Sequence, residues 1–262
     1  VSQLSPGSDE WLDQVREDIV DPDRPIVDPH HHLWQRPSST YVLEELWRDT
    51  ESGHNVEKTV FVECHADYRT DGPEHMRPVG ETRFVTAIAE ASSAGHGTTI
   101  AGIVGHADLT LGEAVEEVLV AHTEAGHGLF RGIRHAGARA VAPDELMIPG
   151  RAPEGLYRSE GFQKGVRVLG RLGLTYDTWQ YHYQLPELTE LARSCPDTVM
   201  VIDHFSTPIG VGRFAGRRKA IFDQWRTDFA ELGRCPNVVA KLGGIAMPDN
   251  GFGWHLRQTP AT

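Results

Sequence analysis

Short apolar runs alternate with amphipathic stretches along most of the chain. The apolar runs cover residues 26–28, 59–64, 100–104, 130–134, 174–177, 199–203 and 238–242. Each run is brief and almost entirely apolar or β-branched, which is typical of parallel strands that are buried on both faces. The pattern therefore predicts seven strands of a parallel sheet.

Stretches with a helical spacing of apolar residues lie between these runs. In the last of them, Phe222, Trp225 and Phe229 form an apolar stripe of the kind that usually packs on a core. We expect helices at residues 10–18, 42–48, 82–94, 113–124, 162–172, 186–193 and 219–232. Strands that alternate with helices predict right-handed crossovers and an α/β fold of the (β/α)8, TIM-barrel type.

The two ends of the chain interrupt this alternation. Residues 1–24 form an N-terminal extension, and residues 243–262 form an irregular tail with no further apolar strand and no helix. Because a TIM barrel needs eight strands, we predict a single barrel domain over 1–262 that lacks its eighth strand at the C-terminus. The proline-rich stretch 136–159 predicts a loop on the active-site face.

The composition limits the classes of partner that the protein is expected to bind. Asp and Glu number 37 against 25 Lys and Arg, which gives a net charge of −12. Such a chain repels phosphate backbones and anionic membranes, so we expect a small-molecule substrate, no nucleic acid and no membrane. The polar start lacks a signal-peptide layout, and the 3 cysteines are scattered, so we expect a cytoplasmic protein with reduced thiols. Assembly into a homo-oligomer stays open.

The strongest local signal is the sequence IVDPHHHLW at residues 26–34. Residues i and i+2 of a strand point the same way, so His30 and His32 project together from its carboxyl end. Two imidazoles on one side form half of a divalent-metal site, and barrel active sites lie at that end. In a chain with 14 His, such a pair also arises by chance in a solvated loop. Its place in the first strand favours the metal interpretation.

The chain resembles the amidohydrolase superfamily, in the branch of sugar-lactone hydrolases and related amidohydrolase 2 proteins. The resemblance rests on IVDPHHHLW, TVFVECHADYR, GIVGHADLTLG, FRGIRHA, LTYDTWQYHYQLPEL, VIDHFSTPIG and VVAKLGGIAM, which follow the order of the family. It implies a distorted (β/α)8 barrel with a divalent metal, zinc foremost and manganese as the alternative. It also implies a metal-dependent hydrolase that opens a lactone or a related small carbonyl compound.

The resemblance implies the metal ligands as well. The first-strand pair of the family matches His30 and His32, and its sixth-strand histidine matches His204. Its fifth-strand histidine matches His182, which lies several residues beyond its strand and is alternatively a substrate contact. His204 has its own alternative, as a hydrogen-bonded histidine at a strand end.

Other residues are candidates for binding substrate. Arg134 ends the fourth strand, and a guanidinium there suits a substrate carboxylate or carbonyl, with an ion pair at the barrel rim as the alternative. Glu63 and Lys241 are inward-facing candidates for substrate contact or for structural pairing. Trp34, beside the histidines, lines the pocket or packs on the rim.

In the family chemistry, the metal lowers the pKa of a bound water towards about 7 and polarises the carbonyl. The carboxylate that takes the proton is normally an Asp at the end of the eighth strand. No counterpart is found here, because the only acid after Lys241 is Asp249, in a polar stretch. The catalytic residue therefore stays unknown. We interpret the sequence as an incomplete or C-terminally truncated member, whose first and seventh strands have exposed edges.

Two alternatives to a hydrolase remain. In one, the metal acts as a Lewis acid in a decarboxylase on the same fold. In the other, the barrel is catalytically incomplete and binds a ligand or partner, for which the missing Asp is the best argument. Nucleotide binding and serine hydrolysis are poor alternatives, because no glycine-rich phosphate motif and no G-x-S-x-G sequence are present.

Overall fold

The computed structural model of the protein describes residues 4–260. One curled sheet has the strand order β1-β4-β5-β6-β7-β8-β9, and all neighbours are parallel. Its strands are β1 (Ile26–His31), β4 (Val56–Val62), β5 (Thr99–Gly105), β6 (Phe130–Arg134), β7 (Thr175–Thr178), β8 (Met200–Ile202) and β9 (Val238–Ala240). The predicted α/β fold of TIM type is confirmed, and each of the seven apolar runs overlaps one strand of the sheet.

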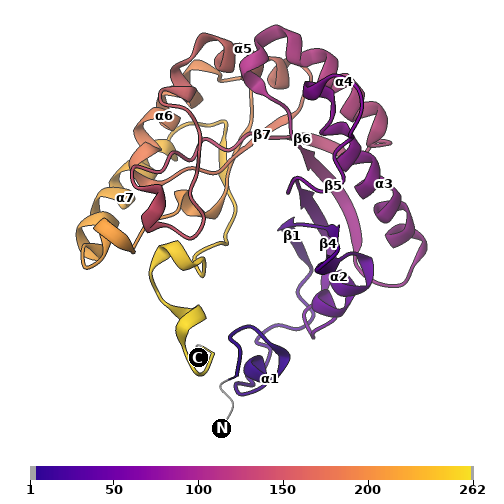
Figure 1. Ribbon diagram of the computed structural model, residues 1–262, viewed down its shortest axis with the longest axis vertical. Coiled ribbons are helices and arrows are strands. Elements are labelled where there is room, and N and C mark those ends of the chain that lie inside the picture. The colour runs from indigo at the N-terminus through magenta and orange to yellow at the C-terminus, as the bar shows by residue number, and fades with distance from the viewer. Residues whose placement is uncertain (1–3, 261–262) are drawn as a thin grey trace.

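The longer helices lie outside the curl of the sheet (Figure 1). They are α2 (Leu43–Thr50), α3 (Val79–Ala94), α4 (Val115–Ala125), α5 (Glu160–Arg171), α6 (Leu185–Ser194) and α7 (Arg218–Leu232). Apolar faces of these helices form the core, as α5 illustrates: its Phe162 and Leu169 share one buried cluster with Ile133 of β6 and Tyr176 of β7. The stripe predicted on α7 packs there only in part, because Trp225 and Phe229 contact the core whereas Phe222 is 49% exposed. Within residues 4–260, no helix combines the length and the apolar character that crossing a bilayer requires.

The sheet is open. Figure 1 shows a horseshoe whose gap lies between its two ends, and no backbone pairing joins β1 to β9 within residues 4–260. Apolar side chains are exposed there: Val27 is 56% exposed, Val239 52% and Leu242 87%. A groove of about 590 Å³ is lined by residues of both edges. The described chain thus has seven barrel strands with exposed edges, as predicted.

Two local predictions differ from the structure. The helix expected at residues 10–18 is the single turn α1 (Asp9–Leu12), which Ser8 caps. Trp11 is buried but Leu12 is 51% exposed, so the expected apolar stripe has no surface to pack on. An unpredicted hairpin, β2 (Trp34–Arg36) and β3 (Ser39–Tyr41), follows β1.

Short 3-10 turns lie in the connections between the helices and strands. They are η1 (Glu74–Met76), η2 (Leu109–Ala114), η3 (Pro143–Glu145), η4 (Leu156–Arg158), η5 (His182–Gln184), η6 (His204–Ser206), η7 (Gly212–Phe214), η8 (Pro248–Asn250) and η9 (Trp254–Leu256). Most of them lie in the loops that follow strands, where barrel proteins carry their functional residues.

The N-terminal extension and the C-terminal tail meet at the open side of the horseshoe (Figure 1). Trp11 Nε1 donates to the Arg257 carbonyl at 3.0 Å, and Gln14 Nε2 donates to the Gln258 carbonyl at 3.1 Å. The tail is also tied to the loop 136–159.

That second tie is made by Asp249, the acid noted after Lys241. Its carboxylate is buried and accepts hydrogen bonds from the backbone N–H groups of Met147 at 2.8 Å and Ile148 at 3.0 Å. Asp249 therefore anchors the loop after β6 and does not lie among the histidines.

Candidate metal centre

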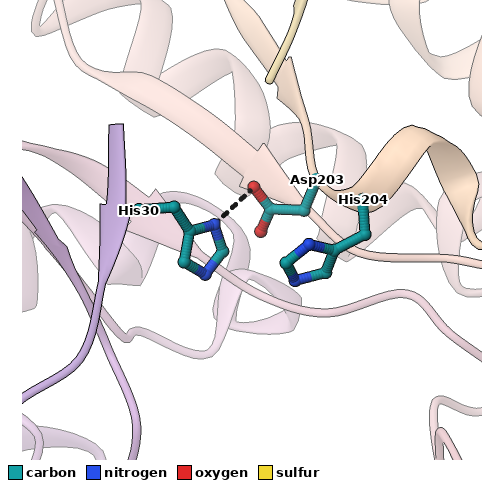
Figure 2. Close-up of side chains that lie close together, drawn as sticks. All are labelled: His30, Asp203 and His204. Atoms are coloured by element: carbon teal, nitrogen blue, oxygen red, sulfur yellow. Dashed lines mark ion pairs between the residues drawn. The ribbon is translucent and has the colours of Figure 1, made fainter. Parts of the chain in front are cut away.

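Three side chains offer ligand atoms that all lie within 4.8 Å of one another: His30, Asp203 and His204. His30 belongs to β1, whereas Asp203 and His204 directly follow β8, so all three lie at carboxyl ends of strands. Figure 2 shows the two imidazoles flanking the carboxylate. Because β1 and β8 are far apart in the strand order, it is the curl of the sheet that brings these groups together.

The backbone after β8 runs in the left-handed region. Four consecutive residues have positive φ: His204 at 52°, Phe205 at 49°, Ser206 at 57° and Thr207 at 33°. For residues with a side chain this conformation is costly, of order 1 kcal/mol or more for each, and it persists only where the surroundings enforce it. Strain of this kind is typical of functional sites, which makes this turn a candidate functional element.

Three side-chain hydrogen bonds hold the left-handed turn in place. Trp225 Nε1 donates to the Phe205 carbonyl at 2.8 Å, and Gln180 Nε2 donates to Ser206 Oγ at 2.6 Å. A third, from Trp179 Nε1, reaches Thr207 Oγ1 at 2.8 Å. The other side of the turn faces Gly244, where a Cβ atom would lie only 2.2 Å from His204 Nδ1. These contacts fix the His204 imidazole beside Asp203.

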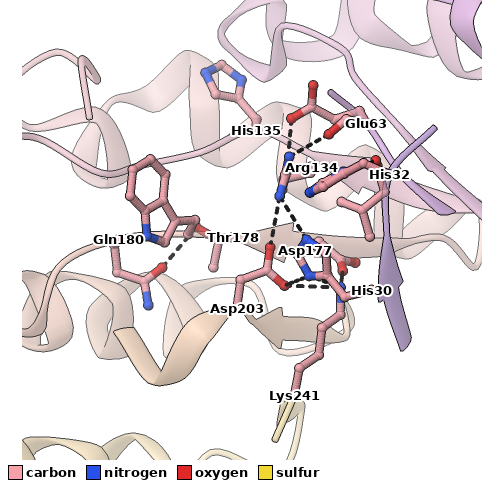
Figure 3. A network of polar contacts seen from close by, with 12 residues as sticks. His30, His32, Glu63, Arg134, His135, Asp177, Thr178, Gln180, Asp203 and Lys241 are labelled. Carbon is pink, nitrogen blue, oxygen red and sulfur yellow. Dashed lines mark hydrogen bonds and ion pairs between the residues drawn. The ribbon is translucent and has the colours of Figure 1, made fainter. Parts of the chain in front are cut away.

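A buried network of charges surrounds the centre (Figure 3). Arg134 Nε lies 2.8 Å from Glu63 Oε1, and its Nη1 lies 3.6 Å from Asp203 Oδ2. Lys241 Nζ lies 2.6 Å from Asp177 Oδ2 and 3.0 Å from Asp203 Oδ1. Three carboxylates thus face two cations, which leaves a negative balance beside the two imidazoles.

Burial sets the protonation states of the centre. It lowers the pKa of His30 and His204 to about 4, and that of His32 in the same direction, so the imidazoles are neutral near pH 7. Burial opposes the charge on Asp203, but the His30 ring, whose Nδ1 lies 3.3 Å from Asp203 Oδ1, and the nearby Lys241 hold its pKa well below the usual range. Burial raises the pKa of Asp177 to about 6. A neutral imidazole and an ionised carboxylate are the forms that bind metal.

These residues fit a divalent cation. Both carboxylate oxygens of Asp203 are buried and accept no well-directed hydrogen bond within residues 4–260. A buried carboxylate is expensive unless cations compensate its charge, and Lys241 and Arg134 are shared with Asp177 and Glu63. The excess of carboxylates in the network supplies the negative charge that a cation site requires, and the two neutral imidazoles supply unprotonated nitrogen atoms. Nitrogen and oxygen ligands suit zinc.

Only two of the four predicted metal ligands belong to the group of His30, Asp203 and His204 in the described chain. His30 and His204 belong to the three-residue group, and the His32 ring lies 5.0 Å from that of His30. His32 Nδ1 lies 2.7 Å from the Val62 carbonyl, and donating there leaves Nε2 unprotonated. The fourth, His182, accepts from the Ile209 N–H at 3.3 Å and lies outside the group, so its role as a ligand stays a prediction.

The residues predicted to bind substrate lie in two places. Arg134 and Glu63 both belong to the charge network, and Arg134 Nη1 lies 3.3 Å from His30 Nε2. Trp34 instead stacks on Tyr41 within the hairpin, with 5.2 Å between ring centroids, and its role stays a prediction. Sequence reasoning missed Asp203 as a ligand candidate, although an acid that ends an apolar run beside a histidine is the signal that would have found it.

A curled parallel sheet with a His-Asp-His group at the carboxyl ends of its strands is the architecture of a metal-site barrel. Residues 27–258 match the sequence profile of the amidohydrolase family. The chain therefore belongs to the amidohydrolase family, as the sequence motifs indicated. Membership supports a metal-dependent hydrolase.

The chain is also similar to individual proteins. The uncharacterized protein y4mH of Sinorhizobium fredii (strain NBRC 101917 / NGR234) is 29% identical over 251 residues, which covers 85% of this chain and 73% of y4mH. An amidohydrolase from Burkholderia multivorans with bound zinc is 22% identical with a TM-score of 0.61, over 84% of this chain and 69% of that one. A second structure, with bound HEPES, gives a TM-score of 0.60 at 21% identity, over 84% and 70% of the two chains. At such identities the structural likeness concerns the fold.

Proposed function

We propose that the protein is a metal-dependent hydrolase that opens a lactone or a related small carbonyl compound. The observation that carries the proposal is the buried Asp203 carboxylate, held between His30 and His204 without a well-directed hydrogen bond in the described chain. These three residues would hold the cation, zinc foremost, and His32 is the nearest further ligand. A small-molecule substrate and a cytoplasmic location remain part of the proposal.

A bound divalent cation supplies a Lewis acid and a water of lowered pKa. The chain itself orders the groups around the substrate. Glu63 fixes one side of the Arg134 guanidinium, and the Nη1 on its other side lies 3.3 Å from His30 Nε2, where it is placed to donate to a substrate oxygen.

Asp203 is the carboxylate nearest to both imidazoles, and in this proposal it moves the proton. Water adds to the carbonyl carbon and the ring C–O bond breaks, which gives a hydroxy acid. Asp203 carries the proton from the attacking water to the departing oxygen. Lys241, at 3.0 Å, and Arg134 keep this carboxylate ionised before the proton arrives.

The test combines metal content with activity. We expect near-stoichiometric zinc or manganese by inductively coupled plasma mass spectrometry, and its loss in His30→Ala/His32→Ala. The matched control is His54→Ala/His96→Ala, because both of these histidines are exposed. Lactone opening, followed by proton release, should fall with the metal in the first variant only.

Two outcomes would point elsewhere. Substoichiometric metal that neither double variant changes would contradict the proposal and favour a binding protein. Stoichiometric metal with carbon dioxide release, and no ring opening, would favour the decarboxylase.

A further inference from the structure

The loops after β4 and β5 line a second cavity, of about 820 Å³, on the same end of the barrel as the metal centre. We name it the β4–β5 pocket. Its wall includes His65, Tyr68, Arg69, Arg77, His106 and Asp108. The proposed reaction assigns none of them a role.

Short contacts connect this pocket to the metal centre. His65 Nε2 lies 3.7 Å from Glu63 Oε2, and Glu63 Oε1 lies 2.8 Å from Arg134 Nε. The Arg134 guanidinium contacts His30, and the Arg134 carbonyl oxygen lies 3.0 Å from His106 Nδ1. The side chains of Glu63 and Arg134 thus lie between the β4–β5 pocket and the metal centre, which places the pocket beside the carbonyl of the proposed reaction.

Most charges in the pocket wall are already satisfied. Arg69 Nε lies 3.2 Å from Asp71 Oδ1. Asp108 Oδ1 accepts from Thr110 N at 2.9 Å and from Thr110 Oγ1 at 2.6 Å. The remaining acid of the wall, Glu74, is exposed.

Arg77 is the exception. Within residues 4–260 its guanidinium makes no ion pair and no side-chain hydrogen bond, and its Nε atom is buried. The hydroxyl of Tyr68 is also buried without a partner in that part of the chain. A half-buried guanidinium in this state favours an anionic ligand, and its planar fork matches a carboxylate.

The loop that carries Arg77 is fixed before any ligand binds. Glu81 Oε1 accepts from Cys64 N at 2.9 Å and from Ala66 N at 2.7 Å, and Arg69 N donates to the Arg77 carbonyl at 3.0 Å. A preorganised binding group loses less entropy when its ligand arrives.

We infer that the β4–β5 pocket binds a carboxylate on the substrate and that Arg77 is the residue that selects it. The inference rests on the proposed function, in which the lactone carbonyl reacts at the metal centre. It names the substrate class as lactones that carry a carboxylate, in preference to neutral lactones of the same size.

The test compares γ-butyrolactone-γ-carboxylate with its neutral amide in the metal-loaded protein. Arg77→Gln should lower kcat/KM for the carboxylate by roughly 10- to 100-fold, the range for a lost hydrogen bond to a charged group, and mainly through KM. Hydrolysis of the amide should not change. The control Arg226→Gln removes an exposed guanidinium on α7 and should affect neither substrate. Equal kcat/KM for the two substrates, with Arg77→Gln behaving as the control, would overturn the inference and leave the proposed function standing.

A binding measurement separates the two proposals. Glutarate, titrated by calorimetry, should bind the wild-type protein at least about 10-fold more tightly than Arg77→Gln. If no lactone is opened but this difference is found, the proposed function fails and the pocket assignment stands. Equal glutarate affinities would overturn the assignment. If Arg77→Gln does not fold, Arg77→Lys, which keeps the charge without the fork, should show a smaller loss of the same sign.

Discussion

The closed side of the horseshoe, around β5, β6 and β7, and the open side, at β1 and β9, differ in how their strands are covered. Ile103, Ile133 and Tyr176 on the closed side are fully buried. On the open side Val27 and Val239 are more than half exposed. Apolar burial, and with it most of the stability, is therefore concentrated on the closed side.

The metal centre, in contrast, is built from residues at the open side. Its residues come from β1, at one edge of the sheet, and from the chain after β8, next to the other edge. No backbone pairing joins these two elements in residues 4–260, so side chains hold them together. The contacts of Arg134 and Lys241 with His30 and Asp203 are the bridge. The geometry of the site thus depends on electrostatics where the rest of the sheet depends on packing.

The largest effect should come from the closed-side core. Ile133→Ala leaves a cavity in a fully buried cluster and should lower the free energy of unfolding by about 3–4 kcal/mol. The matched open-side change, Val239→Ala, should cost less than about 0.5 kcal/mol, because that side chain is already half in water. Urea unfolding measures both, and similar losses would contradict the contrast.

The bridge across the open side should be the next most sensitive feature. With a chelator present, Asp203→Asn should lower the free energy of unfolding by about 3 kcal/mol, because it leaves buried cations less compensated. Glu231→Gln, which breaks an exposed pair with Arg193, is the control and should cause no measurable change. A neutral effect of Asp203→Asn would mean that packing alone positions β1 against β8.

A titration on the closed side should follow. Burial raises the pKa of Glu81 from 4.5 to about 7, despite its two backbone hydrogen bonds. Its contribution to stability is therefore complete below pH 4.5 and is lost as pH rises through 7, by about 2–3 kcal/mol between pH 4.5 and 7 at roughly 1.4 kcal/mol per pKa unit. Glu81→Gln should flatten this slope in unfolding curves measured between these pH values. A slope that persists in the variant would assign it to another group.

The smallest effect concerns backbone strain away from the site. His127, an exposed residue between α4 and β6, has φ of 44°, and its ring pairs with exposed Glu90. His127→Gly should raise the free energy of unfolding by about 0.5–1 kcal/mol, because glycine adopts this conformation without the Cβ clash. The melting temperature provides the measurement. A decrease would show that left-handed residues carry little strain in this chain.

The apolar runs predicted the strands because a parallel sheet buries both faces of each strand, which leaves a simple signal. His30 and His204, which the structure brings together, could be named as candidates because a histidine at a strand end stands out. Asp203 was missed because an acid inside an apolar run looks like a strand boundary. Neither the left-handed turn after β8 nor the isolation of Arg77 could be predicted, since both depend on contacts between segments distant in sequence. The hairpin at 34–41 lacks the Gly or Asn turn that would have announced it.

The contact between the extension and the tail has a mechanical consequence. Tension applied at Trp11 and Arg257 first loads the two hydrogen bonds that join the ends. The force then passes to β1 and β9, which lie at the two margins of the sheet. Each can be peeled from its single neighbour one bond at a time, without shearing a whole strand. The sheet would therefore yield to a pull at Trp11 and Arg257 by unzipping inwards from both margins.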